Sequence, residues 1–475
     1  MLTDLSRLRI FRWPHEDDPK KRLMLDPLPQ DEQNRIMLEP MMKSGPGYWL
    51  LVAILGAIVL ACLFGAWAYF VRWGVGTAGV RRPVYWGMFI ATFVFWIGIS
   101  HAGTFISAIL RVLNAEFRRP ITRAAELMTT FALACGGLFP FIHLGRVWVA
   151  YFMVPAPNQR GLWQNFQSPL IWDELAITTY LLSSTIYVFL PLIPDLAMAR
   201  DRTTGWRHVL YKFTSLGWRG REYEWHYLHK AIKIFAFAII PIMFSVHTIV
   251  SWDFAMSNHV GWHSSIFGPY FIVGAIYSGM SAAITVLLVV RRGMKLDYFL
   301  REEHFNALAM LVLVFSFTWT YFFFNDYLVE WYGGNWVGEQ LLTLQARGPV
   351  APLWYAMLLF NIVIPWLTLW NGRVRRSPIA LFLITIGVNI GMYLERYIIV
   401  TGYLRINNLP FDWGAYTPTI EVPVFIGTVA FFALLYVLAS RVIPLIPVWE
   451  VIEGQLSHTR RRIGKVMVTS VAEWE

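Results

Sequence analysis

Charged side chains rarely interrupt the long apolar runs of this sequence, and one histidine and one aspartate stand out among those that do. His143 lies three residues before Arg146 in one apolar run, and Asp173 opens the next run. An ionisable group within a membrane-length apolar run costs about 3 kcal/mol or more, so a functional role is the first explanation for it. An imidazole that faces a carboxylate in a half-dry cleft can accept protons from a pair of hydroxyl groups. The same two residues could instead form a structural hydrogen bond between two helices.

Further polar residues gather toward the same side of the predicted membrane. We expect His143 about nine residues from the end of its run, which is roughly 13 Å deep, with Arg146 on the same helix face. His247 lies near the end of a later run, and the segment 251–263 that follows contains Asp253 but no Lys or Arg. This segment could cap a cleft, or it could be an interfacial belt anchored by its tryptophans. We group Arg146 and His247 with the first two residues as candidates for a binding site.

Four more ionisable residues lie toward this side in later runs. Glu395 and Arg396 are about two turns from the end of their run, and adjacent helical residues point about 100° apart, so these two need not pair. Asp326 and Glu330 are four residues apart and share a helix face, so they would repel each other unless one is protonated or has a partner. We interpret the three acidic residues as candidate stations for proton transfer.

Fewer ionisable residues lie toward the opposite side, where they could stage protons from the cytoplasm. These candidates are His101, Glu126, Asp195 and His304. Glu126 could instead be a solvated or loop-paired charge at the membrane surface. Haem ligation by two histidines needs both at matching depth on facing helices. We expect His101 in the inner half of its span and His143 and His247 in the outer half, so only the last two could match.

The composition is that of a membrane protein. Of the 475 residues, 56% are hydrophobic and 15% are charged, against about 25% charged in soluble domains. Aromatic residues make up 16%, and the mean hydropathy is +0.48. The two cysteines, Cys62 and Cys135, both lie in apolar runs, so we expect no iron–sulfur, zinc or other metal site in the chain. The excess of basic over acidic residues, 40 to 30, indicates membrane topology rather than nucleic-acid binding.

Ten apolar runs reach the length of about 20 residues that a bilayer span needs. The predicted spans are residues 48–71, 84–110, 124–152, 172–199, 231–250, 266–290, 305–331, 350–370, 379–402 and 419–443. The loops after spans 2, 4, 6 and 8 contain eighteen Lys and Arg residues, whereas those after spans 3, 5, 7 and 9 contain three. The positive-inside rule therefore places both termini in the cytoplasm. The first outer loop, with Arg72, Arg81 and Arg82, is the exception.

A faint internal repeat groups these spans. The segment Gly98–Gly103 in span 2 resembles Gly274–Gly279 in span 6, and Pro169–Trp172 at the start of span 4 resembles Pro352–Trp354 at the start of span 8. Both matches are four spans apart, so we predict an all-α polytopic protein with two parallel four-helix bundles, spans 2–5 and 6–9, flanked by spans 1 and 10. The predicted parts are a cytoplasmic N-terminal arm (1–47), the first span with its outer loop (48–83), the first bundle with the substrate site (84–250), the outer loop and second bundle (251–402), the last outer loop and span (403–443) and a cytoplasmic tail (444–475).

The chain resembles a known family in the order of these features. Ten spans, a long polar arm before the first, the segment Ile142–Arg146 and the segment Pro169–Asp173 are similar to the NrfD/PsrC family of integral membrane subunits that interact with quinol. Within that family the chain resembles the larger NrfD-like subunits, ActC, of bacterial alternative complex III. The likeness covers nearly the whole chain, and its specificity comes from the order of short motifs.

The resemblance implies a function in the bacterial inner membrane. It implies two four-helix bundles, no redox metal in this chain, and oxidation of menaquinol or ubiquinol near the periplasmic face. Electrons would pass to a docked iron–sulfur subunit and then to the c-type haems of a multihaem cytochrome subunit, beside a second NrfD-like membrane subunit and lipids. His143 and Asp173 would form the quinol site, and Asp253 and Arg396 are carried over to it from the family. The resemblance also implies a proton route through such a bundle, and the inner ionisable residues are the candidates for it.

The residues alone lead to a related expectation. Quinol oxidation releases two protons and two electrons, and a chain with two cysteines offers proton acceptors but no electron acceptor. The oxidoreductase activity would then belong to a multisubunit assembly and not to this chain alone. One alternative is a membrane anchor of a periplasmic molybdenum or nitrite reductase, with the electron flow reversed. A second is a proton-coupled secondary transporter, although its substrate site should lie at the midplane, and the polar residues crowd the outer side.

Overall fold

The fold is almost entirely helical, and ten helical spans account for most of it. The computed structural model describes residues 38–42, 44–80, 84–153, 169–334, 336–405, 416–457, 460–463 and 466–469. Ten of its helical segments are long and apolar enough to cross a membrane, which confirms the predicted number. The observed spans are Pro46–Trp73, Met88–Val112, Glu116–His143, Ile171–Arg200, Glu222–Ala255, Phe267–Met294, Glu302–Tyr332, Ala351–Thr368, Pro378–Arg405 and Glu421–Ala439. The predicted N-terminal arm lies largely outside the described residues.

Several spans are made of consecutive helical pieces, and four of the described spans contain a π-helical turn, a feature frequent at functional sites. The elements of the first bundle and of the span before it are α2 (Pro46–Ile58), η3 (Val59–Gly65), α3 (Ala66–Trp73), η4 (Val75–Thr77), α4 (Met88–Thr104), η5 (Phe105–Ile109), α5 (Leu110–Val112), η6 (Glu116–Arg118), α6 (Arg119–Gly137), α7 (Phe139–His143), η7 (Val147–Met153), α8 (Pro169–Arg200), α9 (Trp206–Thr214) and α10 (Glu222–Ala255).

The remaining elements form the second bundle and the C-terminal part. They are α11 (Phe267–Met294), α12 (Glu302–Tyr332), α13 (Trp336–Arg347), α14 (Ala351–Leu358), η8 (Leu359–Val363), α15 (Ile364–Thr368), α16 (Gly372–Arg376), α17 (Pro378–Tyr397), η9 (Ile398–Gly402), η10 (Tyr403–Arg405), α18 (Glu421–Ala439), α19 (Val448–Ser457), β1 (Arg460–Ile463) and β2 (Val466–Thr469). The two short strands pair antiparallel as a terminal hairpin.

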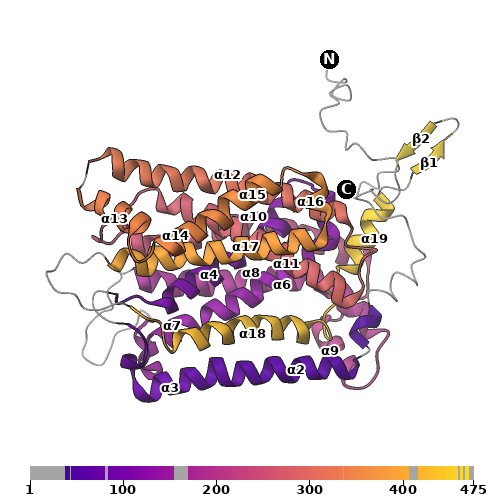
Figure 1. The fold of residues 1–475 in the computed structure, drawn as a ribbon. Helices are drawn as coiled ribbons and strands as arrows, with labels where there is room; N and C mark the ends of the chain where they lie inside the picture. Colours follow the sequence, from indigo (N-terminus) through magenta and orange to yellow (C-terminus); the bar gives the residue numbers. More distant parts are fainter. Residues whose placement is uncertain are drawn as a thin grey trace.

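The spans pack as two four-helix groups. Helix α4 packs on α6, α6 on α8, α8 on α10, and α10 returns to α4 and η5. In the second group α11 packs on α12 and α17, while α14, η8 and α15 contact α17 and α12. The groups meet where α11 packs on α4 and α10, and spans 1 and 10 lie together against the first group (Figure 1). This arrangement agrees with the predicted bundles.

Small residues let α4 lie at the centre of the molecule, where almost all of its side chains are buried. A Cβ atom added at Gly103 would lie 2.1 Å from the Ala125 carbonyl oxygen of α6, and one added at Gly279 of α11 would lie 2.8 Å from Ala102 Cβ. Close backbone approach of this kind is typical of membrane helix contacts. Of the repeat glycines, Gly98 and Gly279 are therefore packing positions between the two groups, whereas Gly103 and Gly274 pack against helices of their own group.

Span 3 differs from the prediction at both ends. It starts at Glu116 and ends at His143, whereas the apolar run predicted 124–152. Gly145 has a φ of +64°, a conformation that favours glycine, and the chain turns there before the 3₁₀-helical segment η7. Hydropathy did not show this end because residues after the turn are also apolar.

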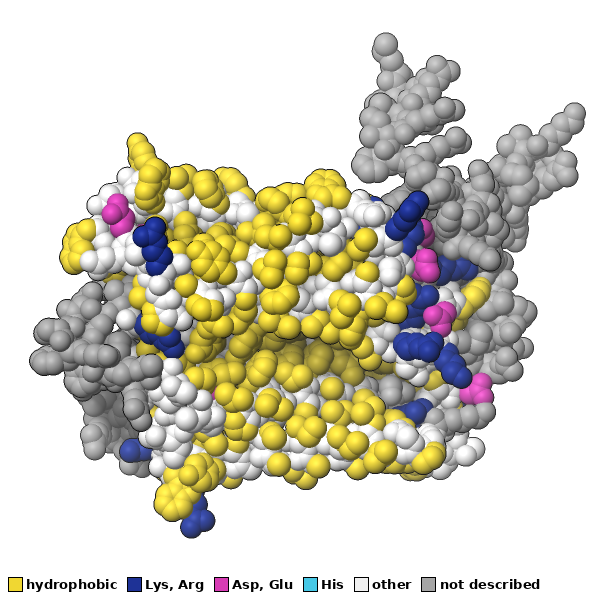
Figure 2. Space-filling view, viewed as in Figure 1, with side chains coloured by type: hydrophobic (Ala, Val, Ile, Leu, Met, Phe, Trp, Pro, Cys, Tyr) yellow, Lys and Arg dark blue, Asp and Glu magenta, His cyan; other side chains and the backbone are white. Residues whose placement is uncertain are grey.

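The two ends of the molecule differ in charge. Lys and Arg side chains are more numerous at the end that carries α16 and α19, and apolar side chains cover the sides of the spans (Figure 2). Residues 38–42 are held at this end, because Arg207 donates a hydrogen bond to the Met41 carbonyl oxygen (2.8 Å) and Arg441 donates one to that of Pro40. The positive-inside rule predicts that this end faces the cytoplasm.

Candidate functional site

Two carboxyl groups from neighbouring spans meet at the end of the first bundle that is predicted to face outward. Asp173 lies in the first turns of α8, and Asp253 lies in the last turn of α10. Their carboxyl groups lie next to each other, and the rings of Trp172 and Trp252 lie 6.1 Å apart. Two ionised carboxylates side by side would repel each other, so we expect one member of this buried pair to carry a proton.

Each carboxyl group of this pair has one oxygen atom left to accept a further hydrogen bond. The Asp173 residue is only 5% exposed, and Oδ1 of Asp173 and Oδ1 of Asp253 are buried without a hydrogen-bond partner among the described residues. Buried polar atoms in proteins are nearly always satisfied by protein, water or ligand. Two such acceptors in one acid pair are suited to a ligand that carries hydroxyl groups.

His143 and Arg146 are arranged differently from our expectation. His143 is the last residue of α7, so it lies at the end of its span and not roughly 13 Å inside it. Arg146 follows the turn at Gly145 and is exposed, so the two side chains do not share a helix face. Within the described residues His143 has no hydrogen bond or ring contact, and its pairing with Asp173 stays a prediction.

His101 and His247 lie together between the two bundles. Both are fully buried, and their ring centroids are 4.6 Å apart. The expected difference in depth is wrong, because His101 lies near the middle of span 2 and reaches the Met243 carbonyl oxygen of α10 (3.0 Å from Nε2). The contacting rings leave no room for a haem iron between them. Neither ring nitrogen of His247 has a hydrogen-bond partner of good geometry among the described residues.

Glu395 and Arg396 form a buried ion pair, although adjacent residues did not need to pair. Arg396 Nη1 lies 3.3 Å from Glu395 Oε2, and both residues are 2% exposed. Trp319 Nε1 donates a hydrogen bond to Glu395 Oε1 (3.2 Å). The Arg396 guanidinium lies 4.4 Å from the ring centroid of Phe271, against which His247 also packs. The pair therefore faces the two histidines from the second bundle.

The two predicted acidic residues of α12, Asp326 and Glu330, differ in their surroundings. Asp326 is 8% exposed and accepts a hydrogen bond from Ser264 Oγ (2.8 Å) of the outer loop. Glu330 is half-buried one turn further along α12. Asp326 and Glu330 share a helix face, so one of them was expected to need a partner, and Ser264 is the partner of Asp326.

The inner end of the first bundle contains a buried charge network. Arg123 Nη2 lies 3.1 Å from Asp195 Oδ2, and its Nε lies 3.6 Å from Glu126 Oε2. Ser107 Oγ donates a hydrogen bond to Glu126 (2.5 Å) and also hydrogen-bonds with the Tyr187 hydroxyl (3.0 Å). Glu126 is 2% exposed, so it is not solvated, but it does pair with Arg123, which had been counted as a loop charge.

A model of a known protein family matches most of the chain. The family model described as polysulphide reductase, NrfD, matches residues 76–407. The chain belongs to the NrfD family. It is accordingly a multi-pass integral membrane protein, and the resemblance on which we based our expectation is confirmed at family level.

Similar proteins are membrane subunits from several organisms. A putative dimethyl sulfoxide reductase membrane subunit of Halobacterium salinarum is 24% identical over 413 residues, covering 82% of this chain and 90% of that protein. The Hdr-like menaquinol oxidoreductase integral membrane subunit of Archaeoglobus fulgidus is 23% identical over 435 residues, covering 86% and 96%. The menaquinone reductase integral membrane subunit of Nitratidesulfovibrio vulgaris is 23% identical over 402 residues, covering 79% and 86%.

Sequence reasoning missed the part that α19 plays in this NrfD-family chain. Glu450 accepts hydrogen bonds from Arg111 and Arg118, each at 2.8 Å, and Asp195 accepts them from the backbone N–H groups of Val448 (3.3 Å) and Trp449 (3.2 Å). Burial opposes ionisation of Glu450, but the two guanidinium groups hold its pKa well below the usual range. The alternation of apolar and acidic residues after Pro447 was the available signal.

His304 also has a structural position. It is fully buried at the start of α12, where its Nδ1 accepts a hydrogen bond from the Arg301 backbone N–H (3.1 Å). The neighbouring Glu303 pairs with Arg376 of α16 at 2.7 Å. These contacts fix the helix start at the end predicted to face the cytoplasm.

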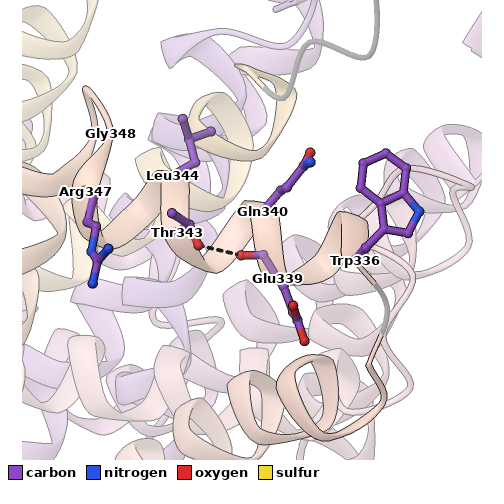
Figure 3. A pocket seen from close by; sticks show the side chains of 7 residues that line it. All are labelled: Trp336, Glu339, Gln340, Thr343, Leu344, Arg347 and Gly348. Atoms are coloured by element: carbon purple, nitrogen blue, oxygen red, sulfur yellow. Dashed lines mark hydrogen bonds between the residues drawn. The ribbon is translucent and has the colours of Figure 1, made fainter.

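An open surface pocket lies apart from all of these residues. One side of α13 from Trp336 to Gly348 lines it, with Glu339 and Arg347 among the side chains (Figure 3). Thr343 donates a hydrogen bond to the Glu339 carbonyl oxygen (2.9 Å). Within the described ranges, no group of three His, Cys, Asp or Glu residues is placed to hold a metal ion.

Proposed function

We propose that this chain is the quinol-binding membrane subunit of a quinol:acceptor oxidoreductase of the alternative complex III type. Menaquinol or ubiquinol would be oxidised at the outer end of the first bundle, beside Asp173 and Asp253. The observation that carries the proposal is the acid pair with two unused buried acceptor oxygens. The names of two relatives, a menaquinol oxidoreductase subunit and a menaquinone reductase subunit, support the same substrate class.

The chemistry follows from the proton balance. Oxidation of one quinol to quinone releases two protons and two electrons. One quinol hydroxyl donates to a free oxygen of the acid pair, which already holds one proton and takes up a second. His143, at the end of span 3, is the proposed acceptor for the other proton, as a general base within reach of solvent. The electrons leave to a partner, for which we propose an iron–sulfur subunit docked outside and a multihaem cytochrome c beyond it.

Single substitutions test the acid pair in the purified complex. Asp173→Asn or Asp253→Asn removes a proton acceptor but keeps the side-chain size, so we expect kcat/KM for quinol oxidation to fall about 100-fold or more. Glu174→Gln is the matched control, because Glu174 is the next residue of α8 and lies outside the pair. Wild-type rates in both aspartate variants would overturn the assignment of the site.

The proteins that copurify with this chain test the kind of complex. Alternative complex III predicts an iron–sulfur subunit, a multihaem cytochrome c and a second NrfD-like protein. A molybdenum-containing partner would instead show a reductase anchor, for which the name of the dimethyl sulfoxide reductase relative gives the precedent. Solute transport by the chain alone in liposomes, without quinol chemistry, would show the transporter alternative.

We also propose a proton route through the first bundle. Near the midplane, His247 contacts His101, whose ring lies 5.3 Å from Tyr180. The Tyr180 hydroxyl hydrogen-bonds to Thr104 (2.7 Å). One turn further along span 2, Ser107 leads to the network of Glu126, Arg123 and Asp195. These contacts connect the midplane to the inner end, and Asp326, Glu330, Glu395 and His304 lie outside this series.

A further inference from the structure

Helix α9, between spans 4 and 5, presents an uncovered apolar face. Trp206, Val209, Phe213 and Leu216 are 67%, 67%, 80% and 67% exposed. Their spacing of three, four and three residues places them on one side of the helix and its C-terminal turn. Four large apolar side chains grouped in this way, at the end of the protein that carries most of the charge, require a covering surface.

The orientation of this face is fixed by the opposite side of α9. Tyr211 is 1% exposed, and its hydroxyl donates a hydrogen bond to the Val442 carbonyl oxygen (3.0 Å) after span 10. His208 Nδ1 lies 3.1 Å from the Arg200 carbonyl oxygen, and Arg200 Nη1 donates to Trp218 O (3.0 Å). The helix is thus attached to the protein by one side, and its apolar side points away.

Basic side chains border the apolar face. Residues 200–221 contain six Lys and Arg residues and one acidic residue, Asp201, which already pairs with Arg200 at 2.8 Å. Four exposed members of this basic group have no acidic partner in a salt bridge among the described residues: Arg202, Lys212, Arg219 and Arg221. An apolar face with a cationic border is complementary to a leaflet of anionic phospholipid.

The face also continues the lipid-facing surface of span 5. Tyr223, Tyr227, Ile234 and Phe237 of α10 are 53%, 64%, 57% and 55% exposed, and their spacing places them on one stripe. Tyrosines followed by aliphatic and phenyl side chains are typical of a membrane interface and the acyl region below it. Seven residues separate the end of α9 from the start of α10, so the apolar face is close in sequence to this stripe.

We propose that α9 lies in the plane of the cytoplasmic membrane surface and binds anionic phospholipid. Trp206, Val209, Phe213 and Leu216 insert among the acyl chains, and the four bordering cations contact the phosphate groups. The site would hold phosphatidylglycerol or cardiolipin at the inner end of the first bundle. This inference rests on the exposed surface and does not depend on quinol oxidation.

Spin labels test the insertion. In a variant without Cys62 and Cys135, a label at Phe213→Cys should collide more with oxygen than with a water-soluble nickel chelate in phosphatidylglycerol liposomes. A label at the neighbouring Lys212→Cys should show the reverse. Protection of position 213 from both reagents would show a covering protein segment, and access to the nickel chelate would show a solvated helix. Either result would overturn the proposal.

Lipid retention tests the charge. Phosphatidylglycerol that remains with the purified complex should fall at least two-fold in the triple variant Arg202→Gln, Lys212→Gln, Arg219→Gln. The control variant Arg292→Gln, Lys295→Gln, Arg373→Gln removes three exposed cations at the same end but away from α9, and it should retain the wild-type amount. Equal retention in both variants would refute anionic lipid binding at α9.

Discussion

The imidazole rings of His101 and His247 lie 4.6 Å apart between centroids, so α4 and α10 meet through two histidines at the same depth. Both ring nitrogens of His101 face backbone carbonyl oxygens, with Nδ1 2.8 Å from Ile97 O and Nε2 3.0 Å from Met243 O. A neutral imidazole has one N–H and can donate to only one of them, whereas an imidazolium can donate to both. The ring can therefore take up and release a proton without moving.

His101→Phe tests whether protons pass this point. Phenylalanine keeps an aromatic ring but removes both nitrogens, so we expect kcat for quinol oxidation by the complex to fall about 100-fold if the proton route is used. The quinol KM should stay unchanged, because the acid pair at the outer end of the bundle is intact. His263→Phe, which changes an exposed histidine of the outer loop, should leave both parameters unchanged. A wild-type kcat in His101→Phe would show that protons take another path.

The buried pair of Glu395 and Arg396 makes a prediction about stability. Each single substitution, Glu395→Gln or Arg396→Met, leaves one buried charge without its partner and should destabilise the protein by about 3–5 kcal/mol. The double variant removes both charges, so its cost should be less than the sum of the single costs. Thermal unfolding of the detergent-solubilised complex measures this coupling. Additive losses would show that the two charges do not stabilise each other.

The ten spans and their grouping could be predicted from the sequence because both depend on local properties. Length and hydropathy define each apolar run. The loop charges predict the orientation of the runs, and the repeated glycine-containing segments predict their grouping. Hydropathy cannot detect a turn between two apolar segments, so the end of span 3 at His143 was displaced by nine residues. The same limit produced a wrong depth for His143 and a wrong helix face for Arg146.

The side-chain partners could not be predicted, because they join residues that are distant in sequence. Arg118 and Arg123 had been counted as loop charges, yet they are 7% and 0% exposed. Arg118 pairs with Glu450 of α19 and Arg123 with Asp195 of α8, and neither of these two pairings leaves a local pattern in the sequence. Asp253 entered the site only through the family resemblance, and its contact with Asp173 became visible when α8 and α10 were placed side by side.

Asp195→Asn should show what the inner network contributes to stability. Asparagine has one acceptor oxygen, so it can still accept one of the two hydrogen bonds from α19, but it no longer neutralises Arg123, which is fully buried 3.1 Å away. We expect a loss of about 3 kcal/mol, seen as a lower Tm of the purified complex. Asp201→Asn is the control, because the Asp201 side chain is 64% exposed and surface pairs contribute little. Equal Tm values for the two variants would contradict the buried-charge explanation.

The docking of α19 should depend on pH through Glu450. Burial disfavours the charged form, but Arg111 and Arg118 overcome this and hold the pKa of Glu450 below its usual range. A carboxyl group with a lowered pKa in the folded state stabilises that state fully above its ordinary pKa, roughly 4.3. The contribution is then lost as the pH falls toward the lower pKa of the folded state. The protection factors of residues 448–457, which are hydrogen-exchange rates corrected for the intrinsic pH dependence of exchange, should therefore be equal at pH 7 and pH 5.5 and should fall below about pH 4.3.

Glu450→Gln separates this charge effect from the packing of α19. The variant leaves two arginines without their common partner, so we expect fast exchange of residues 448–457 already at pH 7, from a loss of about 3–5 kcal/mol. Glu453→Gln is the matched control on the same helix. Its partner Arg119 also pairs with Glu116 at 2.5 Å, and the Glu453 side chain is 28% exposed, so exchange should change little. If Glu450→Gln kept wild-type protection, apolar contacts of Trp449 and its neighbours would be sufficient to hold α19 against the first bundle.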